Sequence, residues 1–210
     1  MRPSIAWASI DPRVRLLHVP RLTERHVPDA DALVATWWST MEAALELPAT
    51  KGVPHHLIQG YEVWHGNKER VDAVWRAPVA KIVIARWLQE LGRDLGVPDP
   101  LMTHIPNAID VDTFRVISPV ETRPRRVAML YAASEFKGGA AGVEILQRAR
   151  DRVPDMTAFL FGAEAPPPRL PAWITYRRAV QPEQLKAALN ECSVYLCPSL
   201  SEGWHLPPAE

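Results

Sequence analysis

The chain carries no excess of charge of either sign, because its 24 lysines and arginines balance its 24 aspartates and glutamates. Nucleic-acid-binding surfaces depend on a surplus of basic residues, so this composition offers no electrostatic case for nucleic acid as a partner. No apolar run approaches the ~18 residues that a membrane span requires. Asp11 and Arg13 interrupt any apolar core of a signal peptide near the N-terminus. A cytoplasmic protein is therefore the default expectation.

Cysteine is scarce, with Cys192 and Cys197 as the two examples in 210 residues. Four residues lie between them, and no further cysteine or histidine pair accompanies them, so we expect no zinc site. We interpret both as reduced core thiols near a strand. Proline, in contrast, is abundant at 21 residues, but it lies mostly between periodic segments and so marks loops.

The first part of the chain alternates between short apolar runs and amphipathic segments. The apolar content of 47% is enough for a real core in one large or two small domains. We expect strands at 15–19, 32–36, 55–59 and 80–85, and helices at 37–47, 67–76 and 87–95. This alternation is typical of a parallel α/β sheet.

The strongest linker signal is Pro98-Asp99-Pro100, after which the alternation begins again. We expect strands at 127–131, 157–161, 173–176 and 193–196, and helices at 138–152 and 182–189. The sequence therefore predicts an α/β protein of two Rossmann-like domains, residues 1–100 and 101–210. Ligands tend to bind in the cleft between such domains.

The last ten residues combine a loop and a helix start with two carboxylates. An apolar strand at 193–196 ends at Pro198, and Pro207-Pro208 suits the first turn of a helix. Backbone N–H groups and a helix N-terminus in such a loop can bind a phosphate. Glu202 and Glu210, on either side, could bind hydroxyl groups. A nucleotide sugar presents both chemistries together.

Seven residues separate Glu202 from Glu210, and this spacing resembles the E-x7-E signature of retaining GT-B glycosyltransferases of the family 4 type. The likeness extends over roughly residues 31–210, and it is clearest in 101–210. Further segments that carry it are Ile105-Pro106-Asn107-Ala108-Ile109-Asp110, Lys137-Gly138, Leu160-Phe161-Gly162 and Tyr195-Leu196-Cys197-Pro198-Ser199. The chain departs from the family pattern at His205, which replaces a glycine, at Trp204, which replaces another aromatic residue, and at Ala132, which replaces an arginine.

The resemblance implies a role for each matching residue. Glu202 would face the donor sugar as the catalytic residue, and Glu210 would bind the ribose hydroxyls. The residues implied at the donor diphosphate are Lys137, Gly138, Gly203, His205 and Leu206. The family mechanism uses no metal and no cofactor. It implies a nucleotide-sugar donor, a glycan or lipid-linked acceptor, and peripheral contact with the inner face of the membrane.

Two alternatives remain open beside the transferase. One is a non-catalytic nucleotide-binding or interaction module of the same fold, and the other is a glycoside hydrolase with Glu202 and Glu210 as paired carboxylates. Because GT-B enzymes of this type are about twice as long, we expect both domains to be incomplete here. His55 and His56 could lie near the donor, although adjacent surface or core histidines are the more ordinary interpretation.

Overall fold

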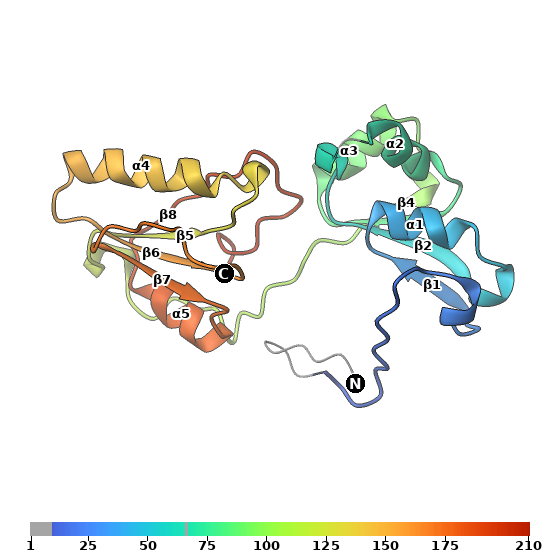
Figure 1. The fold of residues 1–210 in the computed structure, drawn as a ribbon, viewed down its shortest axis with the longest axis horizontal. Coiled ribbons are helices and arrows are strands. Elements are labelled where there is room, and N and C mark those ends of the chain that lie inside the picture. The colour runs from blue at the N-terminus through green and yellow to red at the C-terminus, as the bar shows by residue number, and fades with distance from the viewer. Residues whose placement is uncertain (1–9, 66) are drawn as a thin grey trace. The chain divides into compact units, whose positions relative to one another are not determined.

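The computed structural model describes residues 10–65 and 67–210. It divides into two compact units, the first ending at Asn107 and the second running from Ala108 to Glu210. The division falls beyond the boundary predicted at Pro100, because residues 102–104 pair as a strand with the first sheet. Each unit is described here by itself (Figure 1).

The first unit is a four-stranded parallel sheet with three helices. Its sheet has the strand order β1-β2-β3-β4, so each strand lies beside the next one in the sequence. The elements are β1 (Ala32–Ala35), α1 (Trp38–Leu45), β2 (Val53–Ile58), α2 (Lys68–Arg76), β3 (Ala80–Val83), α3 (Arg86–Asp94) and β4 (Met102–His104).

All three helices of the first unit pack on one face of its sheet. Parallel strands are joined by right-handed crossovers, and a strand order that advances in one direction places every crossover helix on the same side. The core reflects this arrangement: Trp75 and Leu88 from the helices pack with Val83 and Met102 from the strands. Met41 of α1 packs beside them in a neighbouring cluster.

The second unit is also a four-stranded parallel sheet, in the order β7-β6-β5-β8. Its elements are β5 (Arg126–Leu130), α4 (Gly139–Arg152), β6 (Thr157–Gly162), β7 (Ile174–Arg178), α5 (Pro182–Asn190) and β8 (Val194–Tyr195). The central strand β6 is buried from Ala158 to Gly162. Burial on both faces is typical of a parallel strand that has helices above and below it.

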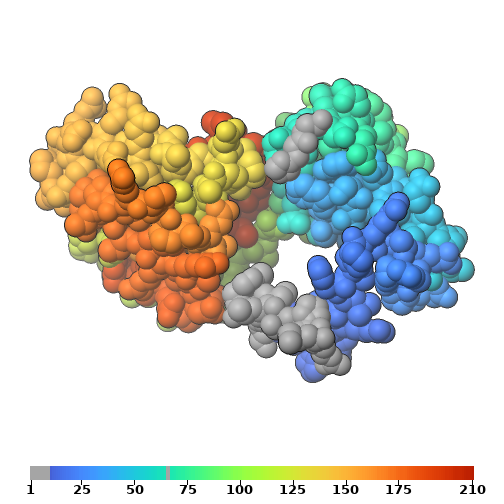
Figure 2. All heavy atoms as spheres, in the orientation of Figure 1, coloured from blue at the N-terminus to red at the C-terminus, as the bar shows by residue number. Residues whose placement is uncertain are grey.

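Helices α4 and α5 cover opposite faces of this second sheet (Figure 1). Leu146 of α4 packs with Met129 and Leu160, whereas Ala188 of α5 packs with Ala128 and Phe159. The space-filling view shows α4 as a continuous outer surface of the unit, in yellow to orange (Figure 2). Since the chain proceeds from β5 to one side and reaches β8 on the other, β5 and β8 form a topological switch point.

The predicted α/β class with parallel sheets is confirmed, and so are the five helices. Among the described residues, however, two strand assignments differ. The segment 15–19 is irregular, so the strand predicted there is wrong. Strand β4 was not predicted, because its three residues directly follow the proline pair at 98–100 and are too few to show a period.

Candidate functional site

The switch point of the second unit brings together two loops that the sequence separates by about sixty residues. One loop follows β5 and ends at Gly138, where α4 begins, and the other follows β8. Crevices at the carboxyl ends of parallel strands, at a switch point, are the usual ligand sites of open α/β sheets. The residues of these two loops therefore define the candidate site.

Backbone contacts hold the two loops against each other. The amide N–H of Leu200 donates to the carbonyl of Phe136 at 2.8 Å, and the Ser199 hydroxyl donates to the carbonyl of Lys137 at 3.4 Å. Gly138 lies so close to Pro198 that a Cβ atom would come within 2.2 Å of the Pro198 carbonyl oxygen. Only glycine permits this approach, and Gly138 also has a positive φ of 64°.

An ion pair joins Lys137 and Glu202 across the two loops. Lys137 Nζ lies 2.7 Å from Glu202 Oε2, and the two side chains are 28% and 19% exposed. The second carboxylate oxygen, Oε1, is buried, and no hydrogen bond reaches it from the described residues. Buried polar atoms normally have a partner, so this oxygen is an acceptor that the described residues leave unused.

The surroundings keep Glu202 ionised. Burial by itself would raise the pKa of Glu202, but the Lys137 ammonium stabilises the carboxylate and holds its pKa below the usual value. The two predicted residues therefore lie together as a carboxylate and an ammonium group. Because Lys137 is already paired, a bound diphosphate would have to compete with Glu202 for it.

Helix α4 adds a fixed positive pole to the same place. Its first residue, Gly139, follows Lys137-Gly138 directly, and its 14 residues contain no acidic group in the first turn. Unpaired N–H groups and the helix dipole favour an anion at such an N-terminus. Ala132, where the resemblance expects an arginine, lies behind this turn: a Cβ on Gly139 would come within 2.2 Å of its carbonyl oxygen.

His205 is held between two side chains rather than pointing freely outward. Its Nε2 lies 3.1 Å from the Tyr195 hydroxyl, and its Nδ1 lies 2.8 Å from the Cys197 sulfur. Burial lowers the pKa of His205 from its usual value, although the Glu202 carboxylate opposes the effect. Cys197 is exposed, so the interpretation of both cysteines as core thiols is wrong for this one.

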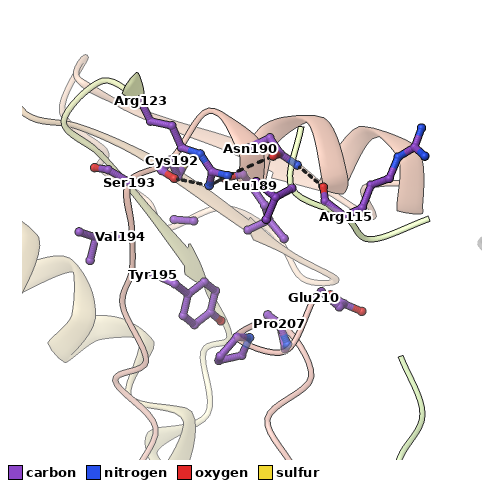
Figure 3. A pocket seen from close by; sticks show the side chains of 13 residues that line it. Arg115, Arg123, Leu189, Asn190, Cys192, Ser193, Val194, Tyr195, Pro207 and Glu210 are labelled. Carbon is purple, nitrogen blue, oxygen red and sulfur yellow. Dashed lines mark hydrogen bonds between the residues drawn. The ribbon is translucent and has the colours of Figure 1, made fainter. Parts of the chain in front are cut away.

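Glu210 occupies a different position from the ion pair. It lines a pocket of about 190 Å³ together with Tyr195 and Pro207, as Figure 3 shows. Burial raises the pKa of Glu210. The amide N–H of Glu210 donates to the carbonyl of Leu206 at 3.1 Å, which is the spacing of a first helical turn. Gly203, the remaining residue of the predicted diphosphate set, follows Glu202 in the same loop.

Arg123 and Asn190 line that pocket and were not among the predicted residues. Arg123 donates to the carbonyls of Leu189 and Cys192 at 3.2 and 3.0 Å and to the Asn190 side chain at 3.1 Å. These bonds satisfy carbonyls at the C-terminal end of α5, as basic residues commonly do there. This pair holds the pocket wall. No sequence motif marks the two residues, because they meet only through the path that the loop takes in the fold.

The two adjacent histidines of the first unit have different surroundings. His55 Nδ1 contacts the Val53 carbonyl at 2.9 Å. His56 is 2% exposed, beneath the helices. Its pKa is lowered to about 4, first by burial and then by the charge of Lys81. His56 stands next to Lys81 in the pairing of β2 with β3, and it fits the interpretation as a core histidine.

Within residues 10–65 and 67–210, no three histidine, cysteine, aspartate or glutamate side chains converge as metal ligands. In the same part of the chain, no helix combines the length and the apolar character of a membrane span.

No protein-family model matches the chain, and no curated protein matches it in sequence. Solved structures do resemble it. A mutant of S. aureus TarM in complex with fondaparinux, alpha-GlcNAc-glycerol and UDP is 9% identical with a TM-score of 0.69, covering 88% of this chain and 40% of that protein. Sucrose-phosphate synthase from Thermosynechococcus elongatus is 15% identical with a TM-score of 0.62, covering 84% of this chain and 52% of that protein.

A third similar structure is Anabaena Alr3699/HepE in complex with UDP-glucose. It is 13% identical with a TM-score of 0.60, covering 80% of this chain and 53% of HepE. At such identities the likeness shows the fold, which is that of the GT-B glycosyltransferases. The chain spans about two-fifths to one-half of the length of these proteins.

Proposed function

We propose that this chain carries the donor site of a retaining glycosyltransferase that moves a sugar from a nucleotide-sugar donor to a glycan or lipid-linked acceptor. One observation carries the proposal: Lys137 and Glu202 are 2.7 Å apart at the switch point, directly before the N-terminus of α4. A cation, a helix N-terminus and a carboxylate with a free oxygen complement a diphosphate joined to a sugar.

Each residue of the site has a task in this chemistry. Cleavage of the sugar–phosphate bond places negative charge on the departing diphosphate, and preorganised positive groups stabilise that charge. Lys137 and the N-terminus of α4, at Gly138, supply them. Glu202 positions the donor sugar and stabilises the positive charge that develops on it. Glu210 binds the ribose hydroxyls, since a carboxylate accepts two hydroxyl hydrogen bonds.

The remaining loop residues, Gly203, His205 and Leu206, would contribute contacts to the diphosphate. The proposed reaction requires no metal and no cofactor, because Lys137 and the helix provide the positive charge. The first unit would hold the acceptor. We place the enzyme in the cytoplasm, with peripheral contact at the inner face of the membrane when its acceptor is lipid-linked.

Uridine is the nucleoside that we propose for the donor. TarM was solved with UDP and HepE with UDP-glucose, and both share the fold of this chain. Titration of UDP, GDP, dTDP and ADP into the chain by calorimetry tests the assignment directly. We expect UDP to bind most tightly, and binding of none of the four would contradict a donor site.

The residues of the site are tested in the same titration. We expect Lys137→Ala and Glu210→Ala each to weaken UDP binding about tenfold or more, which corresponds to ~1.4 kcal/mol. Lys186→Ala is the matched control, because Lys186 lies on α5 and pairs with Glu183 of the same helix. Equal losses in the Lys186 and Lys137 variants would contradict the assigned role.

A non-catalytic nucleotide-binding module is the second candidate. His205 favours it, because its side chain is bonded to Tyr195 and Cys197 at the place where the resemblance expects a glycine. Hydrolysis or transfer of the sugar from UDP-glucose by the chain would exclude this candidate, whereas UDP binding without turnover would support it. Cleavage of a nitrophenyl glycoside without nucleotide would instead favour a glycoside hydrolase.

A further inference from the structure

Tyr195, His205 and Cys197 form a hydrogen-bonded row at the end of β8. His205 Nδ1 lies 2.8 Å from the Cys197 sulfur, and His205 Nε2 lies 3.1 Å from the Tyr195 hydroxyl. The rings of Tyr195 and His205 meet edge to face, with centroids 5.5 Å apart. A nucleophile, a base and a third group that orients the base are the components of an activated nucleophile.

The other cysteine of the chain lacks all of these features. Cys192 is 4% exposed, and burial raises the pKa of its thiol to about 11. Cys197 is exposed and lies beside an imidazole. Reactive cysteines occur in accessible positions beside a basic group, whereas buried thiols are inert. The same chain therefore contains both a candidate and its internal control.

We propose that Cys197 is a nucleophilic thiol, activated by His205, and that it is a site of covalent modification by soft electrophiles at the edge of the candidate donor site. The proposal concerns the chemistry of this thiol, and it stands independently of sugar transfer.

The geometry gives each member of the row one task. In the proposed arrangement, the Cys197 thiol donates to His205 Nδ1, and His205 Nε2–H donates to the Tyr195 oxygen. Burial raises the pKa of Tyr195, so its hydroxyl stays neutral. The Leu130 amide N–H also donates to that oxygen, at 3.4 Å. This tautomer leaves Nδ1 free to take the thiol proton, and Tyr195 fixes the ring in the orientation that does so.

With iodoacetamide the step balances as a simple displacement. The Cys197 sulfur forms a bond to the methylene carbon, the carbon–iodine bond breaks, iodide leaves, and the thiol proton goes to His205. Burial lowers the pKa of His205; of the charged groups around the ring, Glu202 favours the protonated form and Lys137 opposes it. Their ion pair limits the net effect of either charge.

The pH dependence of alkylation measures the activation. An unassisted thiol with a pKa near 8.5 is only about 3% ionised at pH 7. We expect the rate constant at Cys197, followed by peptide mass spectrometry in the full chain, to be about tenfold higher at pH 7 than in His205→Gln. The two rate constants should converge at strongly alkaline pH, where thiols in general ionise without a neighbouring base. Tyr195→Phe should show a smaller fall at pH 7.

Cys192 reports whether each variant is folded, because unfolding would expose it to the same reagent. If Cys192 is alkylated in one of the two variants, His205→Gln or Tyr195→Phe, that variant is unfolded and the other variant decides the test. Equal rate constants at pH 7 for the wild-type chain, His205→Gln and Tyr195→Phe, with Cys192 protected, would overturn the proposal. So would a wild-type rate constant that changes with pH in the same way as that of His205→Gln.

One consequence rests on the proposed function: UDP bound between the two loops should slow the alkylation of Cys197. Calorimetry first establishes whether UDP binds. Failure of UDP to bind would count against the proposed donor site and leave the His205-dependent rates to decide the reactive thiol. Binding of UDP without protection would show that Cys197 lies outside the footprint of the nucleotide, and this consequence would then be wrong.

Discussion

Lys137 and Glu202 neutralise each other at 2.7 Å, although the proposed function gives them different partners. The diphosphate needs the lysine, and the carboxylate both holds the lysine and repels an anion. Pairs of this kind, partly exposed, contribute little to stability. Glu202 therefore competes with the diphosphate for Lys137, and the ion pair adds little to the stability of the fold.

Glu202→Gln separates these roles. We expect the variant to bind UDP at least as tightly as the wild-type chain, because Lys137 is released and a negative charge is removed, and to lose sugar transfer. Calorimetry with UDP and a turnover assay with UDP-glucose measure the two effects. Glu183→Gln, an exposed carboxylate on α5, serves as the control. Weaker UDP binding in Glu202→Gln alone would show that Glu202 supports the diphosphate site rather than competing with it.

His56 makes the stability of the first unit dependent on pH. Its pKa is about 4 in the folded chain and near 6.5 when unfolded, so the unfolded chain binds a proton more readily between these values. Folding stability is therefore fully present above pH 6.5, and it falls as the pH is lowered toward 4. The expected loss is roughly 3 kcal/mol for this single group.

Hydrogen exchange of the β2 and β3 amides between pH 4 and pH 7 follows this loss, after correction for intrinsic exchange rates. His56→Leu should flatten the dependence, whereas His18→Leu, at an exposed position, should keep the wild-type slope. The idea fails if His56→Leu and the wild-type chain lose stability in parallel over this range.

At the scale of residues, the sequence proposed which residues form the site, whereas their contacts became visible only in the fold. The E-x7-E spacing singled out Glu202 and Glu210, and Lys137-Gly138 was singled out as a turn before a helix. The direct bond between Lys137 and Glu202 depends on two loops meeting, and the partners of His205 depend on a loop that turns back to β8. Neither geometry leaves a periodic signal in a single sequence.

At the scale of elements, the joint between the two loops rests on Gly138. This residue has a φ of 64°, and a Cβ would come within 2.2 Å of the Pro198 carbonyl oxygen. Gly96, after α3, also has a positive φ, of 85°, but nothing lies within 4 Å of a Cβ placed there. Substitutions at Gly96 and Gly138 therefore separate the cost of a left-handed backbone from the cost of a steric clash.

We expect Gly96→Ala to lower the free energy of unfolding by about 1 kcal/mol, the cost of a left-handed alanine. Gly138→Ala should cost about 3 kcal/mol, because the loops must also move apart. Denaturant titration measures both, and calorimetry should show weaker UDP binding in Gly138→Ala alone. Equal costs in the two variants would mean that the loops separate without resistance.

Element prediction succeeded where periodicity was strong and failed where it was not. The helix predicted at 138–152, observed as α4, was identified because apolar residues recur at helical spacing from Val143 to Ala149. The apolar residues of 15–19 suggested a strand, but a strand needs a neighbour to pair with, and a local pattern cannot supply one. Conversely, β4 exists because β3 offers an open edge to Met102-Thr103-His104.

At the scale of the whole molecule, each unit has its own sheet and its own core. Leu88 of α3 packs among first-unit residues and Leu160 of β6 among second-unit residues, and both are 0% exposed. Compact units with separate cores are able to unfold separately. A core substitution should therefore be felt in one unit and not in the other.

Leu88→Ala and Leu160→Ala form a matched pair for this test. Each should lower the stability of its own unit by about 3 kcal/mol through lost burial and a residual cavity. Hydrogen exchange resolved by residue should show faster exchange in β3 for the first variant and in β5 and β6 for the second. Leu200→Ala, at a position that is 83% exposed, should change either unit by less than about 0.5 kcal/mol. If both core variants accelerate exchange throughout the chain, the two units unfold as one, and the division at Asn107 has no energetic meaning.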